Sequence, residues 1–234
     1  MIIGLIFTRP QTEVNLEKSN CKISYENLLG CNKLGKDILA LSIYGSLNAI
    51  LFSIPARILT IISLIFIILF IFLLGSFFEQ FMDSLSSVFL SIPSFLLGLL
   101  ILFSFEKSIF IFFVTIFLMD WASAYQTLMS KLTQLKNSPY LKASQVLGGS
   151  KFFIFKKHIL LELFSIGKIL FLTGIPSVIM TLSILSFLGI DFGSDYFGEG
   201  LGEQISFSKD YFYSSPLSLI SPVFGILFLV LIFS

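Results

Sequence analysis

Long apolar runs alternate with short polar segments along the chain. The runs lie at about 46 to 75, 86 to 105, 108 to 128, 163 to 190 and 216 to 234. A helix needs about 20 apolar residues to cross roughly 30 Å of hydrocarbon, and its backbone polar groups must bond within the segment because lipid offers them no partner. The pattern predicts an all-α integral membrane protein, a polytopic helical bundle with five clear transmembrane helices.

A shorter apolar stretch begins the chain. Residues 1–7 are apolar apart from one glycine, and as a helix they would extend only about 10 Å at 1.5 Å per residue. We expect this stretch to be a truncated N-terminal transmembrane helix. A polar segment follows it up to residue 45, so we divide the chain into an N-terminal part, 1–45, and a transmembrane part, 46–234.

Composition excludes a soluble domain. The chain is 56% hydrophobic and 12% charged, with a mean hydropathy of +0.96, and a single core could not bury so much apolar surface.

The chain has few residues that could support catalysis or metal binding. The one histidine, His158, has no second ligand at metal-binding spacing, and no glycine-lysine loop is present to hold a nucleotide phosphate. We therefore expect no catalytic residues, no metal, no cofactor and no nucleic-acid partner.

Charge predicts the orientation in the membrane. Between residues 129 and 161 there are six lysines and no acidic residue, so the positive-inside rule places this loop in the cytoplasm. The segment 191–215 has five acidic residues and a single lysine, which agrees with the outer side one helix later.

A short helix is predicted inside the lysine-rich loop, which we bound at about 129–162. Small and apolar side chains recur there at spacings of three and four residues, which places them on one helical face suited to docking. They are Tyr140, Ala143, Ser144 and Leu147.

A turn and a second helix should follow. Gly148 and Gly149 permit the positive φ that ends a helix. Ser150 can then cap the next helix by accepting from its free N–H groups. The loop therefore reads as helix, turn and helix.

These residues resemble a known motif. Small residues at 143 and 144, Gly148 after them and the triplet His158-Ile159-Leu160 are similar to the EAA loop of bacterial ABC importer permeases. The resemblance implies the type I importer fold, with residues 140–149 as the coupling helix that contacts a cytoplasmic ATPase. Three positions depart from the motif, because Lys142 stands where Glu is frequent, Ser144 replaces the second Ala, and Leu161 replaces a frequent Pro.

A second motif lies ahead of the first long run, where residues 29–37 read LGCNKLGKD. Gly30 and Gly35 allow tight turns, and Asn32 and Asp37 can accept from nearby backbone N–H groups, so the segment could fold as a compact cap on the first long helix. A plain interfacial turn is the other interpretation. The segment resembles LGTDxxGRD of the peptide and nickel permeases, and LSFLG at 185–189 and the spacing of residues 201–216 also resemble that group.

Two cysteines share the polar N-terminal segment. Cys21 and Cys31 could form a disulfide if the segment faces an oxidising space. We favour two unrelated thiols.

Ionisable residues inside apolar runs are costly and need an explanation. Arg57 and Asp120 are candidate residues of a translocation path. For Arg57 we favour pairing with a neighbouring helix, or reaching toward headgroups, over a place on the path. Pro55, Pro93 and Pro176 we interpret as simple kinks.

The resemblance implies a function. The chain would be the membrane permease subunit of an importer for peptides or related small solutes, with nickel chelates included, in the bacterial cytoplasmic (inner) membrane. Its expected partners are a second permease subunit, two ATP-binding subunits that hydrolyse ATP, and an extracytoplasmic solute-binding protein. The alternative is a truncated or degenerate relative that inserts in the membrane without transporting.

Overall fold

The computed structural model describes residues 14–106, 108–190 and 198–234. It divides into two compact units, of which unit 1 comprises Met1–Pro55 and Ile175–Ser234 and unit 2 comprises Ala56–Gly174. Two long helices, α2 (Ile38–Leu74) and α8 (Leu160–Phe187), contribute to both units. The apolar stretch at 1–7 lies outside the described residues.

The all-α prediction is confirmed. Across the described residues the chain forms helices joined by turns, with one isolated antiparallel bridge between Cys31 and Asp37. Four helical stretches there are long and apolar enough to cross a membrane, and a bent pair raises the number to five. The four are Ile38–Leu74, Ile109–Lys136 (α5), Lys151–Phe187 and Pro216–Phe233 (α11).

The run at 86 to 105 is not a single helix, so the sequence prediction is wrong there. It is divided between α3 (Ser76–Ser91) and α4 (Ser94–Ser104), which bend by 88° at the break. Ile92 has φ −98° and ψ 128°, the extended conformation that a following proline imposes on its neighbour. Pro93 therefore breaks this helix fully, whereas Pro55 and Pro176 lie inside continuous helices.

Helix α2 begins earlier than the apolar run that predicted it. The run starts near residue 46, yet α2 starts at Ile38. The Asp37 carboxylate accepts from the backbone N–H groups of Leu39 at 2.8 Å and Ala40 at 3.3 Å, which satisfies two donors at the helix end. With 37 residues α2 is about 55 Å long, longer than the roughly 30 Å of bilayer hydrocarbon.

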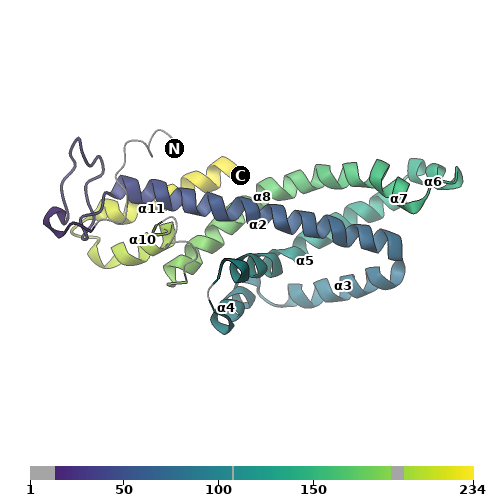
Figure 1. The fold of residues 1–234 in the computed structure, drawn as a ribbon, viewed down its shortest axis with the longest axis horizontal. Helices are drawn as coiled ribbons and strands as arrows, with labels where there is room; N and C mark the ends of the chain where they lie inside the picture. The colour runs from purple at the N-terminus through teal and green to yellow at the C-terminus, as the bar shows by residue number, and fades with distance from the viewer. Residues whose placement is uncertain (1–13, 107, 191–197) are drawn as a thin grey trace. The chain divides into compact units, whose positions relative to one another are not determined.

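The core of unit 2 lies between the second part of α2, helices α3 and α5, and the first part of α8 (Figure 1). Aliphatic side chains at the helix contacts are almost fully buried, and Tyr125 at the middle of α5 has no exposed surface. Three aromatic side chains pack around Trp121, with ring centres 5.1 to 6.5 Å away. These are Phe89, Phe117 and Tyr125.

Unit 1 packs short helices against the first part of α2. Helix α10 (Leu201–Ser208) continues into the 3₁₀ turn η3 (Lys209–Tyr211) and packs against α11. Gln204 donates through Nε2 to the carbonyls of Leu41 at 2.8 Å and Glu199 at 2.9 Å. The N-terminal residues 14–37, with the 3₁₀ turn η1 (Leu16–Lys18), precede α2. We call residues 14–37 the N-terminal cap.

Candidate functional site

The predicted helix-turn-helix is present in the lysine-rich loop. Helix α6 (Pro139–Val146) begins with proline at its first position, where the missing N–H costs nothing. Gly148 then takes φ +83°. The backbone N–H of Gly149 donates to the Ser144 carbonyl, and that of Gly148 to the Gln145 carbonyl, both at 3.0 Å. This pair of bonds is the Schellman motif, which satisfies carbonyls at the helix end without any side chain.

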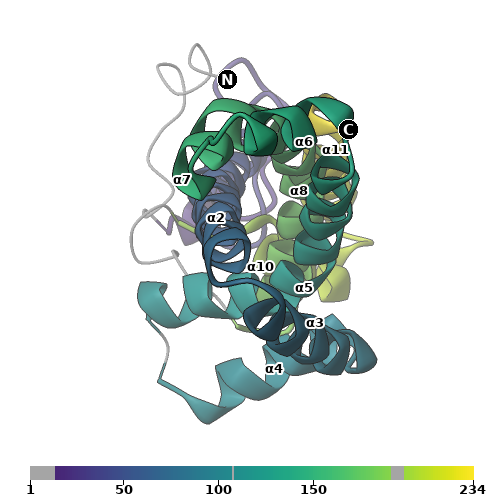
Figure 2. The same ribbon diagram turned by 90° about the vertical axis from the view of Figure 1, so that its right-hand side faces the viewer.

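The second half of the loop also follows the prediction. Ser150 caps α7 (Lys151–Ile154) by accepting from the N–H of Phe153 at 3.3 Å. A π-helical turn, η2 (Phe155–Ile159), then joins α7 to α8. Helices α6 and α7 contact each other, and they lie together at one end of unit 2 (Figure 2).

One buried leucine anchors α6. Leu141 is only 1% exposed and packs with Ile154, Phe155 and Ile159 in the core of unit 2. Replacing a buried leucine with alanine typically costs about 2–5 kcal/mol, so this contact is strong enough to hold a helix of two turns. The anchor orients the rest of α6 outward.

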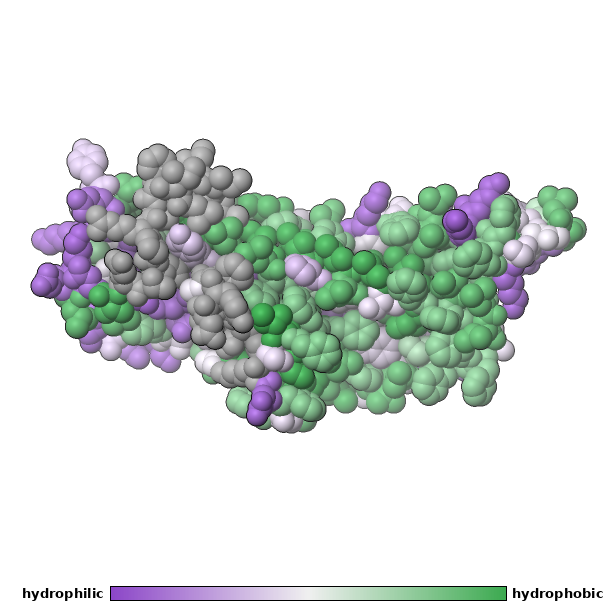
Figure 3. Space-filling model, in the orientation of Figure 1, coloured by the Kyte–Doolittle hydropathy of each residue, from purple (hydrophilic) through white to green (hydrophobic). Residues whose placement is uncertain are grey.

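The predicted face of α6 is largely free. Tyr140 is 47% and Leu147 87% exposed, Ala143 is also exposed, and Ser144 is half-buried. Figure 3 shows hydrophobic side chains at the tip of this region, with a few hydrophilic ones beside them. We call Tyr140, Ala143, Ser144 and Leu147 the docking face. Three of its four side chains are exposed, so most of this face is free to contact a partner.

The motif's histidine lies beside its tyrosine. The rings of Tyr140 and His158 are 5.9 Å apart at 57°, although 18 positions separate the two residues in sequence. His158 is half-buried in the π-helical turn. The structure therefore brings the first and last predicted residues of this loop together.

The segment 29–37 folds as a compact cap, the first of the two interpretations that the sequence left open. Gly30 and Gly35 take φ +77° and +72°. Asn32 is 3% exposed, and its side-chain oxygen accepts from the N–H groups of Leu34 at 2.9 Å and Lys36 at 3.0 Å. Asp37 caps α2 as described above. All four predicted residues of this motif therefore shape the backbone.

The cysteines pair, which corrects our preference for separate thiols. Cys21 and Cys31 form a disulfide with their Cα atoms 4.8 Å apart. The backbone brings them together, because the Cys31 N–H donates to the Cys21 carbonyl at 3.1 Å. Sequence spacing alone could not show this turn of the chain.

Side chains that we did not single out attach the N-terminal cap to the chain after residue 198. Lys36 forms an ion pair with Glu199 at 2.6 Å, with both side chains largely buried. The Lys33 ammonium lies 3.8 Å from the centre of the Tyr211 ring, a cation–π contact. These contacts join parts of unit 1 that are far apart in sequence.

The two candidate pathway residues are bound to each other. Arg57 on α2 forms an ion pair with Asp120 on α5, and its guanidinium also donates to the Leu170 carbonyl on α8 at 2.6 Å. The Arg57 side chain is 3% exposed and that of Asp120 is 28% exposed. Our preference for helix pairing is supported, and the sequence signal for this partner was one cation and one anion in neighbouring apolar runs.

Helix α8 makes room for the guanidinium with a glycine. A Cβ atom on Gly174 would overlap the Arg57 guanidinium. Three helices of unit 2 therefore meet at this ion pair.

Acidic side chains in the first half of α3 contact polar side chains of α5. Glu79 forms an ion pair with Lys136 at 2.7 Å, and Asp83 accepts from the Tyr125 hydroxyl at 2.7 Å. Lys151 donates to the Leu73 carbonyl near the end of α2, at 3.2 Å. Residues 76–85 contain no lysine of their own, and Lys136 supplies the positive charge beside Glu79.

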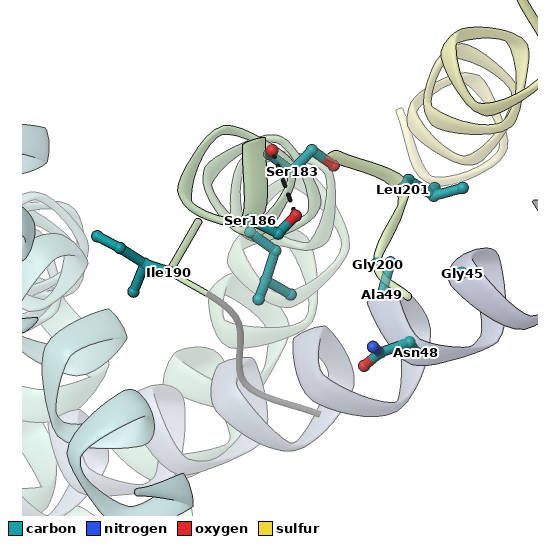
Figure 4. Close-up of a pocket in the computed structure, with 9 residues that line it drawn as sticks. Gly45, Asn48, Ala49, Ser183, Ser186, Ile190, Gly200 and Leu201 are labelled. Atoms are coloured by element: carbon teal, nitrogen blue, oxygen red, sulfur yellow. Dashed lines mark hydrogen bonds between the residues drawn. The ribbon is translucent and has the colours of Figure 1, made fainter. Parts of the chain in front are cut away.

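Unit 1 contains a small cavity of about 20 Å³ with a mixed polar and apolar lining. Asn48 of α2, Ser183 and Ser186 of α8, and Gly200 line it (Figure 4). The Ser186 hydroxyl donates to the Ser183 carbonyl at 3.4 Å. A cavity of this volume accommodates about one water molecule, so it is too small for a peptide.

Within residues 14–106, 108–190 and 198–234, no three His, Cys, Asp or Glu side chains gather in one place.

The chain matches known transport proteins. The family model described as "Binding-protein-dependent transport system inner membrane component" matches residues 64–234. The oligopeptide transport system permease protein OppC of Bacillus subtilis (strain 168) is 23% identical over 190 residues, which are 81% of this chain and 62% of that protein. The chain thus spans less than two thirds of the length of that relative. The resemblance to ABC importer permeases of the peptide group is confirmed, and the chain belongs to the family of binding-protein-dependent transport system inner membrane components.

Proposed function

We propose that this chain is the permease subunit of an ATP-driven importer for peptides or related small solutes, nickel chelates included. ATP hydrolysis takes place on separate subunits that bind the docking face of α6. The similarity to an oligopeptide permease supports the peptide class. The cytoplasmic side of the bacterial inner membrane is the proposed location of the loop, in agreement with its lysines.

The observation that carries the coupling proposal is the contrast between the two sides of α6. Leu141 is buried in the core of unit 2, whereas Leu147, the residue directly after α6, is 87% exposed. A force on the exposed face would pass through Leu141 to the helices that pack around it. A displacement of α6 would therefore move the membrane-spanning helices, and this step requires no catalytic residue on this chain.

The remaining partners follow from the family. We propose a second permease subunit that pairs with this chain, two ATP-binding subunits, and a solute-binding protein on the outer side near the N-terminal cap. The proposed boundary at residue 45 separates that cap and the start of α2 from the transmembrane part.

A second candidate is a relative that inserts in the membrane without transporting. The departures from the EAA motif favour it, since Lys142 on α6 is exposed where the motif often has Glu. Uptake of a labelled peptide by a permease-deletion strain separates the two candidates, because only a working subunit restores it.

Co-purification with candidate ATP-binding subunits tests the docking face. We expect Leu147→Asp to abolish capture, because a carboxylate would be desolvated in an apolar groove. Leu16→Asp is the matched control, since Leu16 is 68% exposed in the N-terminal cap, far along the chain from α6. Equal capture by the two variants would overturn the proposal.

A further inference from the structure

The junction of α7 and α8 exposes a mixed basic and aromatic surface. Phe152 is 58% and Phe153 48% exposed, and the lysines at 151, 156 and 157 are exposed as well. We call Lys151, Phe152, Phe153, Lys156 and Lys157 the basic surface. It lies on different helical elements from the docking face.

The π-helical turn separates this surface from the core. Ile154, Phe155 and Ile159 are at most 3% exposed, and the Phe155 ring packs 5.9 Å from that of Phe72 on α2. The N–H of Leu160 donates to the Phe155 carbonyl, the wider spacing of a π-helix. This turn places Phe155 and Ile159 inside while Lys156 and Lys157 both remain outside.

The positive charge of the surface is not compensated nearby. Lys131 pairs with Glu162 at 3.0 Å and Lys136 with Glu79 at 2.7 Å. Across the described residues, by contrast, Lys156 and Lys157 form no ion pair, and the Lys157 ammonium lies 5.2 Å from the centre of the Phe153 ring. Two lysines of the surface are therefore available to an anion.

The surface also lies where the apolar part of the span begins. Leu161 is 68% and Phe164 48% exposed on α8, about 6 Å and 10 Å along the helix from Lys157 at 1.5 Å per residue. Exposed apolar side chains of a spanning helix face lipid. If the span enters the hydrocarbon at Leu161, lysines one turn before it would stand at headgroup depth, where long basic side chains reach the interface.

We propose that the basic surface binds the phosphate groups of anionic phospholipids in the adjoining leaflet. Lys156 and Lys157 contact the headgroups, and Phe152 and Phe153 enter the interface beside them. The proximity of exposed Leu161 and Phe164 favours lipid over a protein partner, because a protein docked there would meet the acyl chains. Lipid binding at this junction would fix the depth at which α8 enters the membrane.

The test compares lipid selectivity of the full chain in bilayers. Spin-labelled phosphatidylglycerol and phosphatidylcholine report their relative association with the protein surface. A lysine near an anionic surface strengthens binding about fivefold. We expect Lys156→Gln/Lys157→Gln to lower the preference for phosphatidylglycerol at least tenfold, and Lys156→Arg/Lys157→Arg to retain it.

A matched control removes the same charge elsewhere. Lys22 in the N-terminal cap and Lys142 on α6 are both exposed, so Lys22→Gln/Lys142→Gln should leave the preference unchanged. An unchanged preference in the Lys156/Lys157 variant would overturn the proposal. So would a loss of ATPase capture with intact lipid preference, because the lysines would then serve a protein. Competition by soluble glycerol phosphate at constant ionic strength would assign the site to free phosphate and overturn it too.

Discussion

Arg57 and Asp120 form an ion pair across two helices of unit 2, with the arginine almost completely buried. Each residue alone would be an uncompensated charge in an apolar span. The guanidinium also donates to the Leu170 carbonyl, so α2, α5 and α8 share one polar contact. Their pairing makes each charge tolerable only in the presence of the other.

Removing one partner of this ion pair should destabilise unit 2 strongly. We expect Arg57→Leu or Asp120→Leu alone to lower stability by about 3–5 kcal/mol, because a buried charge is left without its partner. The double variant should recover much of that loss. Unfolding of the detergent-solubilised protein measures all three, and additive losses would contradict the pairing.

Leu141 on α6 and Leu147 at its C-terminal end should have different effects, one on stability and the other on ATPase capture. Leu141→Ala removes a buried side chain and should cost about 2–5 kcal/mol. Leu147→Ala should change stability by less than about 0.5 kcal/mol, as exposed substitutions usually do, while weakening ATPase capture. Thermal unfolding and co-purification of the two variants provide the comparison. A large stability loss in Leu147→Ala would mean that this side chain is not free.

Gly202 and Gly225 are helical glycines of unit 1 with different surroundings. A Cβ on Gly202 would overlap the Ser183 carbonyl, whereas one on Gly225 would have its nearest neighbours at 3.4 Å, an ordinary contact. Gly202→Ala should therefore destabilise the protein by about 1–3 kcal/mol through overpacking. Gly225→Ala should be neutral or stabilising by up to about 1 kcal/mol, because alanine favours the helix. The melting temperature of each variant is compared with that of the unmodified protein. It should fall for Gly202→Ala and stay unchanged or rise for Gly225→Ala, and a fall of equal size in both would contradict the packing difference.

The disulfide of the N-terminal cap should be detectable and stabilising. Thiol titration of the denatured, unreduced protein should find no free thiol, and titration after reduction should find both cysteines. Cys21→Ser/Cys31→Ser should lower the stability of the cap by about 2–4 kcal/mol, seen as faster proteolysis between residues 14 and 37. Two free thiols before reduction would refute the bond.

Local structure was predictable from the sequence where backbone chemistry decides it. Glycines with positive φ, Ser150 as a cap and Asp37 as an acceptor of backbone N–H groups are short-range features, and their neighbours in sequence determine them. That α2 starts directly after Asp37, before the apolar run, was not predicted. The break at Pro93 was only half predicted. A proline signals an interruption of the helix. Whether the helix only bends or separates into two also depends on how the flanking segments pack, and here α3 and α4 both contact α5.

Long-range pairing was not predictable from one chain. The partners of Arg57 and Lys36 lie 63 and 163 positions away, and spacing does not distinguish them from other acidic residues. For Cys21 only Cys31 was available as a partner, 10 positions away, and the sequence did not show whether the two thiols meet. The contact between the rings of His158 and Tyr140 was likewise not predictable from sequence spacing. The roles of the docking face, the cap and the ion pair in transport stay predictions.

The turn that ends α6 is closed by backbone hydrogen bonds at Gly148 and Gly149, and the helix is anchored by Leu141. Three of the four side chains of the docking face are exposed, so they contribute less to its folding than Leu141 does. Under the proposed coupling, exposed positions of that face can change under selection for a particular ATPase while the helix keeps its shape. Single substitutions there would then alter which ATP-binding subunit is recognised without unfolding the helix.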